Sequence, residues 1–138
     1  MNNNLNKKVV VIGSGPGGYT AAFRASDLGC NVTLIDKNMN LGGVCLNRGC
    51  IPSKALLYLS HLIDETANSK HKGLNFNKPT IDIKKISNWK NSIIETLSNG
   101  ISSLARKRNI NVINGLASFL SAQKLLVIDK QNKNIKIE

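Results

Sequence analysis

Short apolar runs alternate with helical periodicity in the first part of the chain. Residues 9–12 form a continuous β-branched run that ends at a glycine, which is typical of a buried parallel strand. An alanine-rich stretch over residues 19–28 predicts a helix that also stops at a glycine. Asn31–Asp36 predicts a second strand. Strand, helix and strand within residues 7–36 therefore predict a right-handed βαβ unit with parallel strands.

The middle of the chain changes from polar to amphipathic. Residues 37–49 are polar and glycine-rich, which predicts a loop or an irregular segment, and they open a unit that we place at residues 37–66. Apolar residues spaced for one face of a helix follow at Ala55, Leu56, Leu59, Leu62 and Ile63. After a break at Gly73 and Pro79, a longer helix is expected over residues 82–107. Its apolar stripe consists of Ile83, Ile86, Ile94, Leu97, Ile101 and Leu104.

The last part of the chain, residues 111–138, has the pattern of strands. Residues 111–114 predict a short strand closed by Gly115. Three alternating segments follow, at residues 116–120, 124–129 and 134–137, with polar turns between them, and they predict an antiparallel β-meander. The chain is therefore expected to be an α/β protein with a parallel sheet and an added meander.

Amino-acid composition and charge exclude several classes of function. The 138 residues are 41% hydrophobic and 20% charged, which argues against disorder and against a membrane protein. The net charge is +11, but the lysines are scattered and only one Trp, two Tyr and three Phe are present. We therefore expect no nucleic-acid partner and no membrane partner. The polar residues 1–8 lack a targeting run, and three cysteines without a leader indicate a reducing cytoplasm.

A glycine-rich turn joins the first strand to the first helix. Gly13, Gly15 and Gly18 fit the dinucleotide fingerprint: a tight turn, a backbone open to a pyrophosphate, and close packing of the helix. Asp36 ends the second strand, where its carboxylate can accept hydrogen bonds from the hydroxyls of an adenosine ribose. The alternative is a glycine turn that binds nothing. The turn alone does not separate FAD from NAD.

Cys45 and Cys50 are five positions apart. In a regular helix, that spacing places two residues about 8 Å apart, whereas disulfide-bonded residues have Cα atoms about 4.4–6.8 Å apart. The segment must therefore be distorted if these cysteines bond, and Gly49 supplies that freedom. Pro52 suits the first turn of the next helix, so Cys50 would lie by a helix N-terminus that favours its thiolate. Lys54 adds a positive charge one turn later.

The three cysteines can also have roles outside redox chemistry. Two nearby cysteines can be ordinary small core residues, and the spacing of Cys45 and Cys50 leaves that alternative open. The sequence argues against a metal site at Cys45 and Cys50, because neither a second pair of cysteines nor a cluster of histidines is present to complete four ligands. Cys30, at the start of the second strand, is expected to serve packing.

The whole segment from Gly42 to Leu57 resembles the redox-disulfide signature of the flavin-dependent pyridine nucleotide–disulfide oxidoreductases. Within that family, Cys45-Leu46-Asn47 and Gly49-Cys50-Ile51-Pro52-Ser53-Lys54 resemble the dihydrolipoyl dehydrogenase branch. Glutathione and mercuric reductases usually carry valine at positions 46 and 51, and glutathione reductases usually carry lysine at position 53. These related reductases remain the alternative.

The resemblance implies an incomplete Rossmann-like FAD-binding domain and a set of roles. Cys45 would be the outer, interchange thiol, and Cys50 the thiol that faces the flavin. Lys54 would approach the reactive edge of the isoalloxazine, and Asp36 would bind the adenosine ribose. The remaining cofactor-binding residues implied are Gly13, Gly15, Pro16, Gly17 and Gly18 at the pyrophosphate, Lys37, Gly42, Gly43, Val44 and Cys45 along the cofactor, and Gly115 and Ala117 near the adenine.

Two residues depart from the family pattern. The ribose acid is often Glu, so Asp36 is one methylene shorter and its ribose contact is expected to weaken or shift. Arg48 stands where a small apolar residue is usual. Its charge would either lower the pKa of the cysteines or disturb packing under the flavin.

The resemblance to this branch implies oxidation of dihydrolipoamide to lipoamide with NAD, through FAD and the disulfide. It also implies that the full-length protein serves 2-oxo acid dehydrogenase complexes and acts as a homodimer. The NAD-binding and dimerisation domains are not represented in these 138 residues, so we expect an N-terminal part that retains FAD weakly and is inactive alone. The alternative is a different class of protein, a non-catalytic remnant that only binds a dinucleotide.

Overall fold

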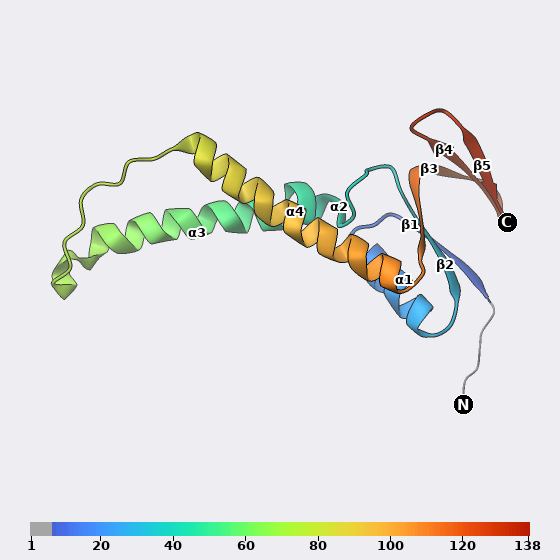
Figure 1. The fold of residues 1–138 in the computed structure, drawn as a ribbon, viewed down its shortest axis with the longest axis horizontal. Helices are drawn as coiled ribbons and strands as arrows, with labels where there is room; N and C mark the ends of the chain where they lie inside the picture. The colour runs from blue at the N-terminus through green and yellow to red at the C-terminus, as the bar shows by residue number, and fades with distance from the viewer. Residues whose placement is uncertain (1–6) are drawn as a thin grey trace.

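A computed structural model describes residues 7–138 of the chain. The polar residues 1–6, on which part of the targeting argument rests, lie outside the described residues. Figure 1 shows a sheet-bearing body at one end and two long helices, α3 and α4, that extend from it as an arm. The glycine turn and the start of the redox segment belong to the body.

The predicted βαβ unit is confirmed. It consists of β1 (Lys8–Ile12), α1 (Pro16–Asp27) and β2 (Asn31–Asp36), and β1 pairs with β2 in parallel. The helix begins at Pro16, three residues earlier than the pattern predicted. A proline in the first helical position loses no hydrogen bond and has its φ angle already set for a helix. The glycine turn is therefore shorter than expected, and its last glycines lie inside α1.

The prediction of a loop over residues 37–49 is wrong for its second half. A six-residue helix, α2 (Gly43–Arg48), occupies it, and Gly49 separates α2 from α3 (Cys50–Ala67). Leu46 of α2 is buried against the core, which stabilises a helix too short to form by itself. A single 3₁₀ turn, η1 (Asn68–Lys72), follows α3.

The long helix α4 (Ile83–Lys107) occupies the predicted range almost residue for residue. Asp82 caps it by accepting a hydrogen bond from the Lys85 amide at 3.0 Å. Just beyond its C-terminus, Arg108 forms an ion pair with Asp27 at 2.9 Å, which ties α4 to the end of α1. The arm is thereby anchored on the body.

The described strands form one open, mixed sheet in the order β1-β2-β3-β4-β5. β3 (Asn111–Ser121) pairs in parallel with β2 through its first residues, and then antiparallel with β4 (Lys124–Asp129), which pairs with β5 (Asn134–Ile137). The α/β fold with an antiparallel meander is confirmed.

The expectation that Gly115 ends the third strand is wrong. The backbone continues through this residue, so residues 111–114 and 116–120 belong to one strand. A Cβ atom at position 115 would lie 2.6 Å from the Val127 side chain and 2.7 Å from the Ile128 carbonyl oxygen. This glycine therefore permits β4 to approach closely, rather than turning the chain.

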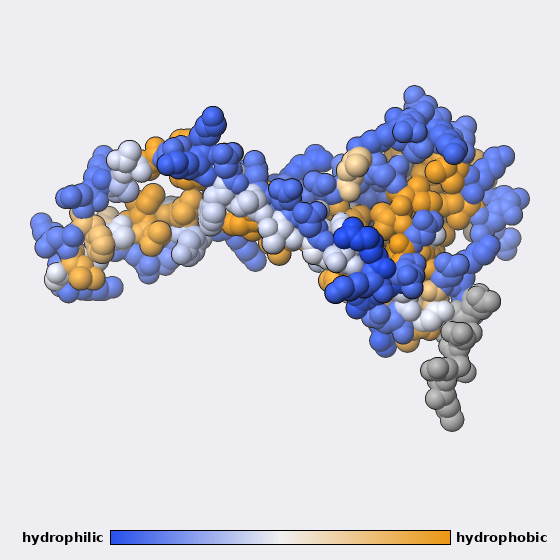
Figure 2. Space-filling view, in the orientation of Figure 1, coloured by the Kyte–Doolittle hydropathy of each residue, from blue (hydrophilic) through white to orange (hydrophobic). Residues whose placement is uncertain are grey.

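The main core lies between the helices and one face of the parallel strands. Its buried members are Ala22, Val32, Leu34, Leu41, Leu46, Ile101, Ala105 and Ile110. The apolar stripes predicted for α3 and α4 are covered only near the body: Ala55 and Ile101 are buried, whereas Leu62 is exposed. Figure 2 shows the resulting hydrophobic patches on the arm. None of the helices in the described part is long and apolar enough to cross a bilayer.

Candidate functional site

The glycine turn lies where β1 passes into α1. The Gly13 amide donates to the Ile35 carbonyl at 2.7 Å, which holds the turn against β2. A Cβ atom added at Gly15 or Gly17 would meet nothing within 4 Å, so the backbone there borders open space. At Gly18, an added Cβ would collide with the carbonyl oxygen of Gly13. The turn is thus packed tightly on its inner side and open on its outer side.

The start of α1 suits an anionic group. Gly15 is its N-cap residue and provides no side-chain cap for the first amides of the 12-residue helix. Free amides and the positive end of the helix dipole favour a phosphate at this position. The open backbone at Gly15 leaves room for one. The turn therefore fits the pyrophosphate of a dinucleotide such as FAD.

The redox segment packs directly on this turn. The Gly42 amide donates to the Ser14 carbonyl at 2.9 Å, immediately before α2 begins. Gly43, whose φ angle is 63°, lies so close that an added Cβ would be 2.6 Å from the Cα atom of Gly15. Backbone meets backbone at this point. Any side chain at position 43 would push α2 away from the turn.

Asp36 is buried at the end of β2, with 8% of its surface exposed. Its Oδ2 atom accepts hydrogen bonds from the Ser14 amide at 2.7 Å and from the Ser14 hydroxyl at 2.6 Å. Its Oδ1 atom accepts from the amide of Asn38 at 2.8 Å and from the Asn38 side chain at 3.1 Å. The carboxylate that was predicted to bind a ribose is thus held by four donors of the chain itself.

These contacts set the ionisation of Asp36. Burial alone raises the pKa of the carboxyl group, but the hydrogen bonds from Ser14 and Asn38 together outweigh it and hold the pKa below its ordinary value of 3.8. The folded chain therefore prefers the ionised form, and Asp36 is a carboxylate at neutral pH.

We expect the stabilisation from Asp36 to depend on pH. Because its pKa is lower in the folded state, the contribution is complete above the ordinary pKa of 3.8, which holds in the unfolded chain, and is lost as the pH falls through the folded-state value. Asp36→Asn should therefore destabilise the chain at pH 7, and the difference from wild type should shrink below about pH 4. Urea unfolding of both proteins between pH 7 and pH 3 measures this, and a constant difference would contradict the ionised, hydrogen-bonded carboxylate.

Cys45 and Cys50 form a disulfide, with Cα atoms 4.8 Å apart. The regular helical spacing is broken at Gly49, between α2 and α3, as the sequence required for a bond. Cys50 is the first residue of α3 and is exposed, whereas Cys45 in α2 is half-buried. Cys30 is the free cysteine and packs against the main core.

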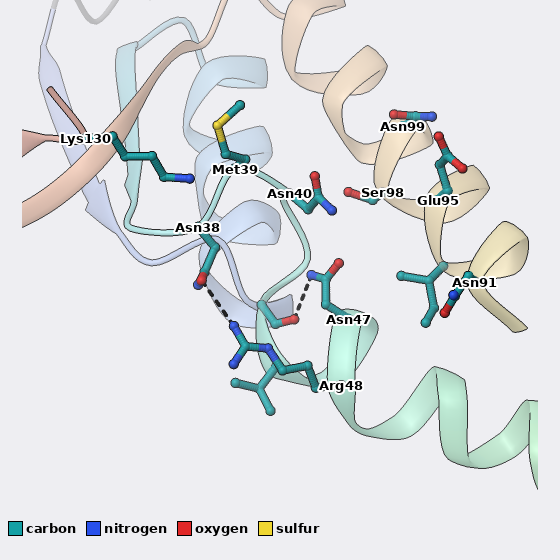
Figure 3. A pocket seen from close by; sticks show the side chains of 13 residues that line it. Asn38, Met39, Asn40, Asn47, Arg48, Asn91, Glu95, Ser98, Asn99 and Lys130 are labelled. Atoms are coloured by element: carbon teal, nitrogen blue, oxygen red, sulfur yellow. Dashed lines mark hydrogen bonds between the residues drawn. The ribbon is translucent and has the colours of Figure 1, made fainter. Parts of the chain in front are cut away.

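A polar cleft of about 590 Å³ lies beside the disulfide segment, between α2 and α4 (Figure 3). Arg48 lines it and donates to the Asn38 side-chain oxygen at 3.2 Å. The sequence suggested that the charge of Arg48 would lower the pKa of the cysteines or disturb packing under the flavin. It did not indicate this contact with Asn38. Asn47 donates to the Gly43 carbonyl at 2.9 Å, and its own side-chain oxygen is buried without a hydrogen-bond partner within residues 7–138. The wall of the cleft is rich in side-chain amides, which come from Asn38, Asn40, Asn47, Asn91 and Asn99.

The other predicted residues are spread around the turn and the disulfide. Lys54 lies one turn after Cys50 on α3 with an exposed side chain, and Lys37 and Val44 are also exposed. Ala117 is half-buried in β3, opposite Val127 of β4. In the described part of the chain, no three His, Cys, Asp or Glu residues gather as metal ligands.

Ser14 and Asn38 are site residues that the sequence reasoning missed. Ser14 occupies a variable position of the glycine fingerprint, where nothing in the pattern indicates a side-chain role. Asn38 follows Asp36 by two residues, the spacing at which an Asp side chain commonly accepts from the backbone. That local signal could have indicated the amide contact, although not the side-chain contact.

Comparison with known proteins gives consistent matches. A family described as pyridine nucleotide-disulphide oxidoreductase matches residues 7–137. The chain is 48% identical to a dihydrolipoyl dehydrogenase of Buchnera aphidicola subsp. Schizaphis graminum, over 96% of this chain and 28% of that protein. It is 46% identical to a dihydrolipoyl dehydrogenase of Vibrio parahaemolyticus, over 92% of this chain and 27% of that protein. The chain thus spans little more than a quarter of the length of these relatives.

Proposed function

This chain belongs to the pyridine nucleotide-disulphide oxidoreductase family, and on that premise we propose that it carries the FAD-binding turn and the redox disulfide of a dihydrolipoyl dehydrogenase. The observation that carries the proposal is a disulfide that joins Cys50 to Cys45 of α2, a helix whose first residue is in backbone contact with the glycine turn. Such a disulfide, close to a phosphate-binding turn, can exchange electrons with a dithiol on one side and a bound dinucleotide on the other.

We assign FAD to the glycine turn on three supporting features. The open backbone at Gly15 and the uncapped amides of α1 suit the pyrophosphate, and ionised Asp36 suits the ribose end. In this proposal Gly13, Pro16, Gly17 and Gly18 complete the turn, while Lys37, Gly42, Gly43 and Val44 follow the cofactor toward Cys45. Gly115 and Ala117 serve the adenine end, and Lys54 the flavin end.

The disulfide performs the first half of the reaction with residues of this chain. A thiolate of dihydrolipoamide attacks the Sγ atom of Cys45, which breaks the Cys45–Cys50 bond and forms a mixed disulfide. The electron pair of the broken bond stays on Cys50 as a thiolate. The second substrate thiol, as its thiolate, then attacks the substrate sulfur of the mixed disulfide, and Cys45 leaves. Lipoamide is released, and two electrons remain in the chain as a dithiol.

The position of Cys50 supports this order of attack. Thiol–disulfide exchange is faster when the leaving thiol has a low pKa, and helix N-termini stabilise thiolates. Cys50 begins the 18-residue α3, whereas Cys45 lies inside the six-residue α2. Expelling Cys50 is therefore the easier direction. Side-chain exposure does not decide the order, because Cys50 is the more exposed of the two.

Reoxidation of the dithiol is the chemistry that bound FAD supplies, with NAD as the final electron acceptor. In this proposal the complete protein serves a 2-oxo acid dehydrogenase complex in the cytoplasm and acts as a homodimer. The chain's own part is to bind the dinucleotide, hold the disulfide beside it and accept the substrate thiols.

A single-turnover measurement tests the dithiol reaction without any cofactor. Oxidised chain is mixed anaerobically with excess dihydrolipoamide, and the lipoamide formed is quantified by chromatography. We expect about one equivalent of lipoamide per chain, because one disulfide accepts two electrons. Glutathione serves as the comparison thiol. Absence of lipoamide, or faster reduction by glutathione, would contradict the proposed substrate.

A further inference from the structure

The carboxylate of Asp36 has no free acceptor position in the folded chain. An ionised carboxylate has about four lone-pair sites, and four donors occupy them here. A ribose hydroxyl that binds Asp36 must therefore displace one of the chain's own donors. The contacts of the four donors indicate which of them can leave Asp36.

Three of the four donors are fixed. The amides of Ser14 and Asn38 belong to the backbone of the turn and of the loop after β2. The Ser14 hydroxyl is on a residue with no exposed surface and makes the shortest contact, at 2.6 Å. The Asn38 side chain differs from them: its bond to Asp36 is the longest, at 3.1 Å, and the side chain lines the open cleft.

We propose that the side-chain amide of Asn38 occupies the acceptor position on Asp36 that a ribose hydroxyl takes, so that Asn38 tunes the affinity for dinucleotides with an adenosine ribose. This inference rests on the proposed FAD site at the turn. Asn38 is a specificity-determining residue of that site: when the ribose arrives, its amide leaves the Oδ1 atom of Asp36.

Arg48 holds the oxygen end of the same Asn38 side chain. Its guanidinium already holds the side-chain oxygen of Asn38 at 3.2 Å, on the wall of the cleft shown in Figure 3. In this proposal the Asn38 nitrogen leaves Asp36 for the open cleft that the side chain already lines, and the exposed Arg48 side chain can follow the Asn38 oxygen. Arg48 lies between the two cysteines in the sequence, so the ribose position is linked to the redox segment through the side chains of Asn38 and Arg48.

Titrating the chain with FAD and with FMN tests this inference, because FMN lacks the adenosine ribose. Removing the competing amide with Asn38→Ala should tighten FAD binding about three- to tenfold, the range for losing one intramolecular hydrogen bond. FMN binding should stay unchanged. Flavin fluorescence quenching gives both affinities, and Asn88→Ala, an exposed asparagine on α4 outside the cleft, is the matched control.

A second measurement uses the wild-type chain. In ¹⁵N–¹H spectra, the Asn38 side-chain amide, identified by its loss in Asn38→Ala, should shift on adding FAD and not on adding FMN. Equal FAD affinities of wild type and Asn38→Ala would overturn this inference and leave the proposed function standing. An Asn38 side-chain amide signal that does not shift when FAD is added would have the same consequence. Failure of every variant to bind FAD would overturn the FAD site and the inference together.

Discussion

Replacing Gly18 by alanine should lower the free energy of unfolding by about 2–3 kcal/mol, the size typical of overpacking a tight contact. The added Cβ atom would collide with the carbonyl oxygen of Gly13, which is main chain and has no rotamer by which to move away. Relief requires a shift of α1 away from the turn. The same shift would disturb the anchoring of the first amides of α1 at the phosphate position.

Gly17 offers a matched control in the same turn of the same helix. An added Cβ atom there meets nothing within 4 Å, so Gly17→Ala should leave stability unchanged or raise it by up to about 1 kcal/mol through helix propensity. Urea unfolding followed by circular dichroism compares the two variants. Equal stabilities of Gly18→Ala and Gly17→Ala would refute the close approach of α1 to the turn.

Oxidation of dihydrolipoamide should disappear entirely in Cys45→Ser and in Cys50→Ser. Each variant lacks the disulfide that accepts the two electrons, and neither serine oxygen can form or accept an exchangeable sulfur bond. Cys50→Ser keeps the proposed interchange thiol and should form a mixed disulfide with glutathione, which brings no second thiol that could release it, while no neighbouring cysteine can resolve the adduct. Mass spectrometry after treatment with oxidised glutathione detects that adduct.

Cys30→Ser is the control for these substitutions, because Cys30 is the free cysteine and packs against the core. It should keep the full single-turnover yield of about one equivalent of lipoamide. A loss of yield in Cys30→Ser comparable to that in the other two variants would mean that the Cys45–Cys50 pair is not the electron acceptor.

Elements with strong local signals were predictable from the sequence. A β-branched run, a glycine turn and a second run ending in an acid indicate the βαβ unit, and a regular apolar stripe indicates α4. α2 was missed because six residues carry too little periodicity. It depends on burial of Leu46 and on the contact of Gly43 with Gly15, which no local pattern contains.

The same division holds at the site. The glycine turn follows from residue type and spacing, because its chemistry requires those residues at those intervals. The disulfide pair followed from the resemblance of residues 42–57 to the family's redox signature, since the spacing of Cys45 and Cys50 alone left the bond open. The bond between Ser14 and Asp36 spans 22 positions, and Arg48 meets Asn38 only after α2 has formed. The sequence therefore indicated the acid but not the donors that surround it, because the fold brings those donors together.

The contact of Gly43 with Gly15 has a consequence for how this protein can diverge. The spacing between α2, which carries Cys45, and the glycine turn is set by a contact between the backbones of Gly43 and Gly15. Substitutions of surface side chains leave that spacing untouched, because no side chain takes part in the contact. A substitution of Gly43 would change that spacing, since an added Cβ atom there would lie 2.6 Å from the Cα atom of Gly15.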